Sequence, residues 1–302
     1  MMVFTLILTP PVDSGNVLLV PVPLYSFVNS ISLVGEELKL LGHSVSVLAC
    51  ATHAHVPCQH DLNVIDAGVD EASTNFPNDV LESAMEEDLD YFDITTMLFN
   101  ATGTQCEMTF QREEFWDILE AENFDLVIVP GEPDTLCYLT IPHRLSIPYV
   151  VLSAYANPSP LRVGSLPSVE QTHSVYLFEN FPSLWHRMQN LYHQFYLYWV
   201  WRPSPLEQFN FLNRYAPDKP RTTLHDLYLK AEMWIFFIDT ICLDYPRVEA
   251  PHCRYISGVH LKPAMPLPQD LQLFADSAVD GLVVVSLGSG IGCVPASLLN
   301  GI

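Results

Sequence analysis

The sequence predicts an α/β protein whose core is a doubly wound parallel sheet, followed by the start of a truncated second α/β domain. Three observations predict this class. The chain opens with a strand–helix–strand pattern over residues 16–50. Two more apolar runs, at 124–129 and 147–152, are typical of parallel strands buried on both faces. A valine-rich run at 281–290 follows a proline-rich segment and indicates a new unit of the same kind. The first unit is therefore expected to be a doubly wound α/β domain.

The opening unit is predicted from its apolar periodicity. Residues 16–22 are interpreted as a buried strand, because valine and leucine occur there without polar alternation. Residues 27–41 are interpreted as a helix, and a second strand at 44–50 completes a right-handed βαβ unit. The loop Pro23-Leu24-Tyr25-Ser26 contains no glycine, so a dinucleotide-binding fingerprint is excluded. The inward face of the helix is predicted to carry Val28, Ile31, Val34, Leu38 and Leu41.

The composition excludes several classes of partner. With 302 residues, 49% of them hydrophobic and 16% charged, the chain is long enough to bury a large core. Thirty-five acidic and thirteen basic residues give a net charge of −22, which disfavours nucleic acid and anionic membrane surfaces as partners. The seven cysteines are widely spaced and form no CxxC pair, so neither a zinc ribbon nor a dithiol redox motif is predicted.

A histidine-rich segment at 51–69 has two interpretations. His53, His55 and His60 lie in it together with Cys58, and metal ligation is one interpretation. The other is a solvated, irregular loop. The spacing fits neither a helix-borne pair of ligands nor a zinc finger, so we favour the loop and predict no metal site.

The first residues of the chain, 1–15, are apolar but lack a basic segment and soon reach Pro10-Pro11. A short secretory signal and a plain apolar tail are both open interpretations. No later stretch approaches the length of an uninterrupted transmembrane span.

Two helices are predicted between residues 78 and 122. The first, at 78–99, is amphipathic with an acidic face, which we interpret as solvated rather than catalytic. Asn100-Ala101-Thr102 is an N-glycosylation sequon in a predicted loop, and it matters only if the chain is secreted. The second helix, at 105–122, is predicted to direct Phe110, Phe115, Ile118 and Leu119 inward.

Two acidic residues follow the strand at 124–129, at the sheet edge where open α/β proteins place their ligands. Glu132 and Asp134 have two interpretations. They orient a catalytic base, or they are surface acids that complement the dipole at a helix N-terminus. A helix that ends at Arg144 and the strand at 147–152 complete this part of the sheet.

The rest of the chain is less regular. Residues 157–168 are predicted to be a loop, and the aromatic-rich helical segment 178–201 is interpreted as core or as the wall of an apolar ligand cleft. A late strand is predicted at 233–237. The prolines of 261–268 predict an extended linker before the last unit.

Seven short sequence features follow one another along the chain. They are Gly42-His43-Ser44-Val45-Ser46-Val47-Leu48, Phe124-Asp125-Leu126-Val127, Leu145-Ser146-Ile147-Pro148, Asp244-Tyr245-Pro246-Arg247, Tyr255-Ile256-Ser257-Gly258, Pro266-Leu267-Pro268 and Val285-Ser286-Leu287-Gly288-Ser289-Gly290. Together they resemble the UDP-glycosyltransferases of animals, the glucuronosyltransferase family. Their order and spacing fit the amino-terminal half of that family over nearly the whole chain.

The resemblance implies a GT-B fold and a division into domains. Residues 16–260 would be the Rossmann-like acceptor-binding domain, and 261–280 a proline-rich linker with a short helix. Residues 281–302 would be the first strand and loop of a truncated donor-binding domain. In this family a sugar passes from a UDP-sugar to a small lipophilic acceptor, and neither a metal nor another cofactor is needed.

The resemblance also implies roles for individual residues. In the family, a histidine in the first βα loop is the base and an aspartate after a later strand supports it. Here Ser26 or a near neighbour stands at the histidine position, and Glu132 at the aspartate position. Donor contacts would come from Ser286, Gly288 and Ser289, and acceptor contacts from Tyr25, Phe27, Trp185 and Tyr192.

Two functions are consistent with these residues and with the resemblance. The first is UDP-sugar-dependent glycosyl transfer, with the activity belonging to a full-length form in the lumen or membrane of the endoplasmic reticulum. The second is a non-catalytic acceptor-domain remnant that binds lipophilic small molecules or associates with full-length relatives as a homo- or hetero-oligomer. UDP-sugar is expected as co-substrate only where a donor domain is supplied.

Overall fold

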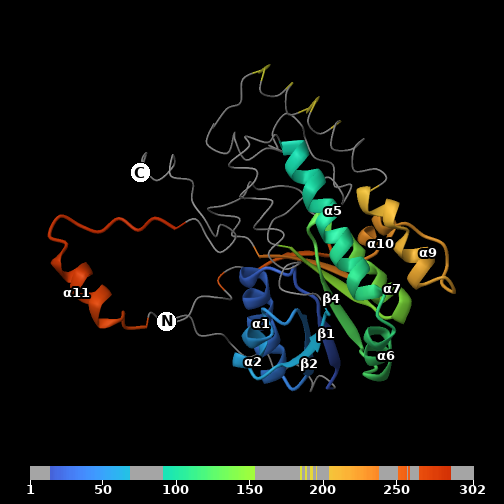
Figure 1. Cartoon of the computed structure of the whole chain (residues 1–302), viewed down its shortest axis with the longest axis horizontal. Helices are drawn as coiled ribbons and strands as arrows, with labels where there is room; N and C mark the ends of the chain where they lie inside the picture. Colours follow the sequence, from blue (N-terminus) through green and yellow to red (C-terminus); the bar gives the residue numbers. More distant parts are fainter. Residues whose placement is uncertain are drawn as a thin grey trace.

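A seven-stranded parallel sheet forms the centre of the molecule (Figure 1). The computed structural model describes residues 14–68, 91–153, 204–237, 251–256 and 265–286, with 184, 185, 188, 191, 192, 195 and 258. The strand order is β3-β2-β1-β4-β5-β6-β7. The strands are β1 (Asn16–Leu19), β2 (Ser44–Ala49), β3 (Asn63–Asp66), β4 (Leu126–Pro130), β5 (Tyr149–Ser153), β6 (Met233–Phe236) and β7 (Cys253–Tyr255).

The predicted βαβ unit is confirmed. Strands β1 and β2 pair in parallel, and helix α1 (Tyr25–Leu40) connects them. Gly42 turns the chain between α1 and β2 with a φ of 96°, a conformation that glycine adopts without strain. Leu41 was predicted to lie on the inward face of the helix, but it is exposed because the helix has already ended at Leu40.

The order of the sheet reverses at β1. Strands β2 and β3 lie on one side of β1, and β4 to β7 lie on the other. In open α/β sheets the loops at such a reversal diverge and leave a crevice at the carboxyl ends of the strands. The sheet therefore predicts a ligand site between the ends of β1 and β4.

Side chains from the two faces of the sheet enter two separate cores. On β1, Val17 and Leu19 pack with Ile31 of α1, whereas Leu18 packs on the opposite side. That opposite side is covered by α5 (Tyr91–Phe110), α6 (Glu113–Ala121) and α7 (Thr140–Leu145) (Figure 1). Because both faces are covered, β1, β4 and β5 lack polar alternation, as the sequence indicated.

Four parts of the sequence prediction are corrected. The segment 51–69 is not an irregular loop, since it contains α2 (His55–Gln59) and β3. The predicted loop at Asn100 lies inside α5, and the predicted helix at 105–122 is broken between α5 and α6. Ile118 is exposed rather than inward. Strand β7 was not predicted. Both missed strands are short edge strands, which carry little periodicity.

The predicted linker and second domain at the carboxyl terminus stay a prediction, and only part of this segment is described. Residues 281–286 are in no strand, and Val283 is 87% exposed. A strand buried on both faces needs paired neighbours, and no described strand pairs with this segment. Helix α11 (Gln269–Ser277) before it buries no residue. Of the predicted helix at 78–99, residues 91–99 lie in α5 and 78–90 lie outside the described residues, as do the predicted loop at 157–168 and most of 178–201.

Within the described ranges, no helix combines the length and the apolar character that crossing a bilayer requires.

Candidate functional site

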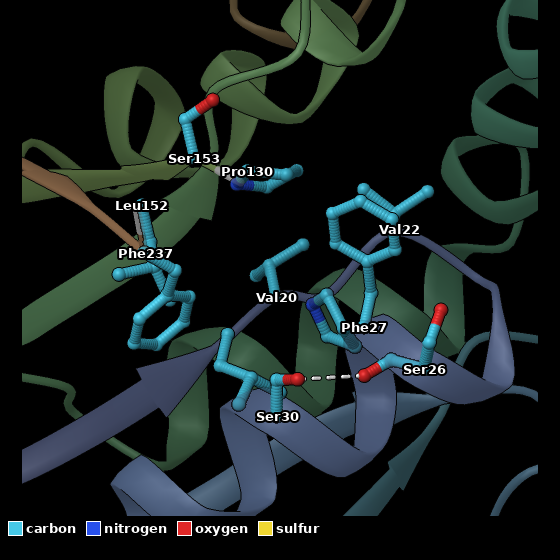
Figure 2. Close-up of a pocket in the computed structure, with 11 residues that line it drawn as sticks. Val20, Val22, Ser26, Phe27, Ser30, Pro130, Leu152, Ser153 and Phe237 are labelled. Atoms are coloured by element: carbon cyan, nitrogen blue, oxygen red, sulfur yellow. Dashed lines mark hydrogen bonds between the residues drawn. The ribbon is translucent and has the colours of Figure 1, made fainter. Parts of the chain in front are cut away.

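A cavity of about 210 Å³ opens at the carboxyl ends of the central strands, at the point where the strand order reverses. Figure 2 shows the start of α1 on one side and the ends of β4, β5 and β6 on the other, with Val20 between them. The lining residues are Val20, Pro21, Val22, Ser26, Phe27, Ser30, Ile31, Pro130, Leu152, Ser153 and Phe237. The cavity thus lies where the topology predicts a ligand.

The first turn of α1 presents three of the predicted site residues. Ser26 and Phe27 line the cavity, and the Ser30 hydroxyl donates a 2.9 Å hydrogen bond to the carbonyl oxygen of Ser26. Tyr25 does not line the cavity. Its ring instead meets His53 edge to face, with 6.4 Å between the ring centroids. Helix α1 therefore brings Ser26 and Phe27 to the site and leaves Tyr25 beside it.

The opposite wall depends on a close approach of β4 to β5. The N–H of Gly131 donates to the Leu152 carbonyl at 2.9 Å, and the Tyr228 hydroxyl donates to the Gly131 carbonyl at 2.6 Å. A Cβ atom on Gly131 would lie 2.7 Å from both the Cβ of Ser153 and a methyl group of Val151. Only glycine fits here without movement of the wall.

We expect Gly131→Ala to lower the free energy of unfolding by about 1–3 kcal/mol, because the added methyl group forces β4 and β5 apart. Chemical denaturation measures this change. Gly15→Ala is the matched control, since its Cβ would meet its nearest neighbour at an ordinary 3.5 Å. If Gly131→Ala and Gly15→Ala have the same free energy of unfolding, the close approach of β4 to β5 at Gly131 is contradicted.

Glu132 lies directly behind this wall and is only 6% exposed. The Ser153 hydroxyl donates to its Oε1 at 3.2 Å. The N–H and the hydroxyl of Thr135 both donate to the Glu132 carbonyl, at 2.9 and 2.7 Å. Glu132 is therefore a fixed, buried acid and not a surface residue, and Ser153 stands between its carboxylate and the cavity.

Asp134 lies in the first turn of the 3₁₀ helix η1 (Pro133–Leu139) and is not a solvated surface acid either. The Thr102 hydroxyl donates to its Oδ2 at 3.5 Å, and burial raises the pKa of its carboxyl group. The folded protein therefore holds this proton to a higher pH than the unfolded chain does. Stability must fall as the pH rises from the ordinary aspartate pKa through the raised one.

We expect Asp134→Asn to raise the free energy of unfolding at pH 7 by on the order of 1 kcal/mol, because it removes a buried charge and keeps a hydrogen-bond acceptor for Thr102. The gain should vanish below the ordinary aspartate pKa. Denaturation curves across pH test this, with Asp270→Asn in the exposed first turn of α11 as the control. If the gain in unfolding free energy does not change with pH, removal of the Asp134 charge is not its cause.

A disulfide between Cys106 and Cys137 joins α5 to η1. The sequence left the pairing of the cysteines open. Cys50 is free and buried, and Cys58 is free and exposed. The turn that carries Glu132 is thus anchored five residues further on by a covalent bond.

The chemistry of the cavity follows from its lining. Apolar side chains make up most of it, and the hydroxyl-bearing residues are Ser26, Ser30 and Ser153. None of the described lining residues has a side chain that titrates near neutral pH. Such a cavity suits a lipophilic molecule with a polar group.

The histidine side chains of the segment 51–69 do not converge on a common point. His60 pairs with Glu36 at 2.9 Å, and His55 contacts the carbonyl oxygen of Thr52. Burial lowers the pKa of His53, which lies beside Tyr25. Among the described residues, no three His, Cys, Asp or Glu side chains are arranged to hold a metal ion.

The remaining predicted site residues lie away from the cavity or beyond the described part. Trp185 and Tyr192 are exposed and do not line it, so their role in acceptor binding stays a prediction. Ser286 is exposed, and Gly288 and Ser289 lie outside the described residues. Ser153 and Phe237 line the cavity but were not predicted from the sequence, although their place at strand ends would have identified them.

Comparisons with known proteins give a consistent result. A family model described as UDP-glucoronosyl and UDP-glucosyl transferase matches residues 15–302. Human UDP-glucuronosyltransferase 3A1 is 31% identical over 205 residues, covering 64% of this chain and 36% of that protein. Rat 2-hydroxyacylsphingosine 1-beta-galactosyltransferase is 29% identical over 206 residues, with 65% and 36% covered. The matches thus span about a third of the length of these relatives.

Among solved structures, the spinosyn forosaminyltransferase SpnP is similar over 86% of this chain and 55% of that one, with 16% identity and a TM-score of 0.49.

Proposed function

Because the chain belongs to the UDP-glucoronosyl and UDP-glucosyl transferase family, we propose that it provides the acceptor-binding part of an enzyme that transfers a sugar from a UDP-sugar to a small lipophilic molecule. The observation that carries this proposal is the apolar, serine-lined cavity at the reversal of the sheet. Its walls exclude water from an apolar ring, and its hydroxyl groups offer hydrogen bonds to the group that receives the sugar.

The names of two relatives indicate the chemical class. One is a glucuronosyltransferase, and the other is named for galactosyl transfer to 2-hydroxyacylsphingosine. We therefore propose glucuronic acid or another hexose as the sugar and a lipophilic alcohol, acid or amine as the acceptor. The acceptor atom would attack the anomeric carbon while UDP leaves with the bonding electrons, which inverts the configuration.

Removal of the proton from the acceptor requires a general base. Ser26 stands at the family's base position, and a serine hydroxyl titrates far too high to remove a proton at neutral pH. Loss of a general base typically costs about 10²–10⁴-fold in rate. Glu132 is proposed as the counterpart of the supporting aspartate, and Ser153 links it to the cavity. Ser286, Gly288 and Ser289 are proposed to contact the diphosphate through their loop.

The proposed location is the lumen or membrane of the endoplasmic reticulum. The disulfide between Cys106 and Cys137 supports this location, because structural disulfides persist in oxidising compartments.

Sugar transfer tests the proposal directly. The chain is assayed alone and as a fusion with the carboxyl-terminal half of human UDP-glucuronosyltransferase 3A1, with several UDP-sugars and a panel of phenolic acceptors. The native human protein is the positive control. Transfer by the chain or the fusion above the no-enzyme rate is expected. A folded fusion that transfers nothing, beside an active control, would contradict the proposal.

A second function is favoured by the described residues of the cavity lining, which are apolar or carry a hydroxyl group. A protein of this kind would bind a lipophilic acceptor without turnover, alone or in association with relatives. We expect its melting temperature to rise with lipophilic phenols and to change little with UDP. A shift with UDP as large as that with a good acceptor would count against this second function.

A further inference from the structure

The sequon Asn100-Ala101-Thr102 is not used by the proposed transferase function. It meets the Asn-X-Thr requirement with alanine at the middle position. The sequence Asn157-Pro158-Ser159 does not qualify, because proline occupies the middle position. Asn100 is therefore the one usable acceptor in the 302 residues, so an attached glycan can be assigned without ambiguity.

The structure places the Asn100 side chain where a glycan can be carried. Asn100 lies within α5 and is exposed, whereas Thr102, two residues on, is buried. The Gln208 side chain donates from Nε2 to the Oδ1 atom of Asn100 at 3.2 Å. This bond uses the amide oxygen and leaves the Nδ2 atom, which is the one that carries a glycan, on the exposed side chain. The bond can persist after modification, since Oδ1 remains an acceptor.

The buried position of Thr102 fixes when the modification must occur. Its hydroxyl donates to Asp134, and its carbonyl oxygen lies 3.9 Å from the Cys137 sulfur. An enzyme that has to contact this hydroxyl reaches it only before α5 packs against η1. The modifying enzyme can therefore bind the sequon in the emerging chain but not in the folded protein, although the Asn100 side chain itself remains exposed.

The disulfide provides independent evidence for the required compartment. Cys106 lies on the same helix, six residues after Asn100, and is bonded to Cys137. Oxidising compartments that form such bonds include the lumen in which N-glycans are attached. The disulfide and the sequon are thus two separate indications that the chain enters this lumen.

We propose that Asn100 is an N-glycosylation site. Its Nδ2 atom forms a bond to the anomeric carbon of an oligosaccharide carried on a lipid diphosphate. The bond from that carbon to the diphosphate breaks, and Nδ2 loses one proton. The glycan then projects from the α5 surface beside Gln208, away from the buried face that holds the disulfide. This proposal does not depend on transferase activity.

The test is expression of the full chain in a eukaryotic cell, followed by digestion with a peptide N-glycosidase, which hydrolyses the glycosylated amide, and peptide mass spectrometry. We expect a gel shift that digestion removes, with Asn100 converted to aspartate in its peptide. Asn100→Gln should lose the shift. Thr102→Ser should keep it, because the sequon and the hydroxyl are both preserved, whereas Thr102→Ala should lose it.

Two outcomes would overturn the proposal. The first is an unmodified Asn100 in protein that contains the Cys106–Cys137 disulfide, which would show that the chain reaches the compartment and the site is not used. The second is an unmodified Asn100 in protein with both cysteines reduced, which would show that the chain does not enter the oxidising compartment in which N-glycans are attached. A glycan that persists in Asn100→Gln would also contradict the assignment.

Discussion

Loss of the disulfide between Cys106 and Cys137 is expected to lower the free energy of unfolding by about 3–4 kcal/mol, from the chain entropy of a loop of this length. The two cysteines are 31 residues apart in sequence and both are buried. The bond holds η1 against α5 and so fixes the turn that carries Glu132. The measurement is chemical denaturation of the Cys106→Ala/Cys137→Ala double variant beside the parent.

Two controls separate the bond from simple packing. Reductant should destabilise the parent and leave the double variant unchanged. Cys58→Ala, at an exposed free cysteine, should stay within about 0.5 kcal/mol of the parent. If the parent has the same unfolding free energy with and without reductant, the disulfide does not stabilise the fold.

Phe110→Ala is expected to lower the free energy of unfolding by about 3–5 kcal/mol, the usual range for a buried aromatic residue. Phe110 is 1% exposed and lies at the centre of an aromatic cluster. Its ring centroid is 5.2 Å from that of Trp116, 5.7 Å from that of Phe211 and 5.5 Å from that of Tyr215. The ring therefore joins α5 and α6 to the later helix α9 (Phe211–Tyr215).

The matched control is Phe274→Ala. Phe274 lies on α11 and is exposed, so its truncation should change stability by less than about 0.5 kcal/mol. Similar losses in both variants would show that the aromatic cluster does not hold the fold together.

The central strands could be predicted from the sequence because they are buried on both faces. The predicted runs at 16–22, 44–50, 124–129 and 147–152 correspond to β1, β2, β4 and β5, with boundaries that shift by a few residues. The predicted strand at 233–237 corresponds to β6. Continuous apolar residues are the signature of such strands, so the middle of the sheet was visible without any structure.

The edges of the sheet were not visible in this way. Strand β3 has four residues and ends at the exposed Asp66, and β7 has three with Arg254 exposed at its centre. Their pairing depends on a neighbouring strand rather than on their own periodicity. The sequon at Asn100 was predicted to lie in a loop, but it lies inside α5, and the Thr102 hydroxyl donates to Asp134 of η1.

The candidate site was predicted in part. Ser26 and Phe27 follow from the first βα loop, and both line the cavity. The burial of Glu132 did not follow, because it depends on Gly131 letting β4 approach Ser153. The disulfide could not be derived either, since seven cysteines allow many pairings.

The most direct test of the central claim is binding of a lipophilic phenol to a variant whose cavity is filled. Ser30→Phe places a ring in the cavity, and Glu37→Phe places the same ring on the exposed surface of α1. Calorimetric titration should show that Glu37→Phe binds like the parent and that Ser30→Phe, with its melting temperature retained, does not bind. Undiminished binding by Ser30→Phe would contradict the assignment of this cavity as the acceptor site.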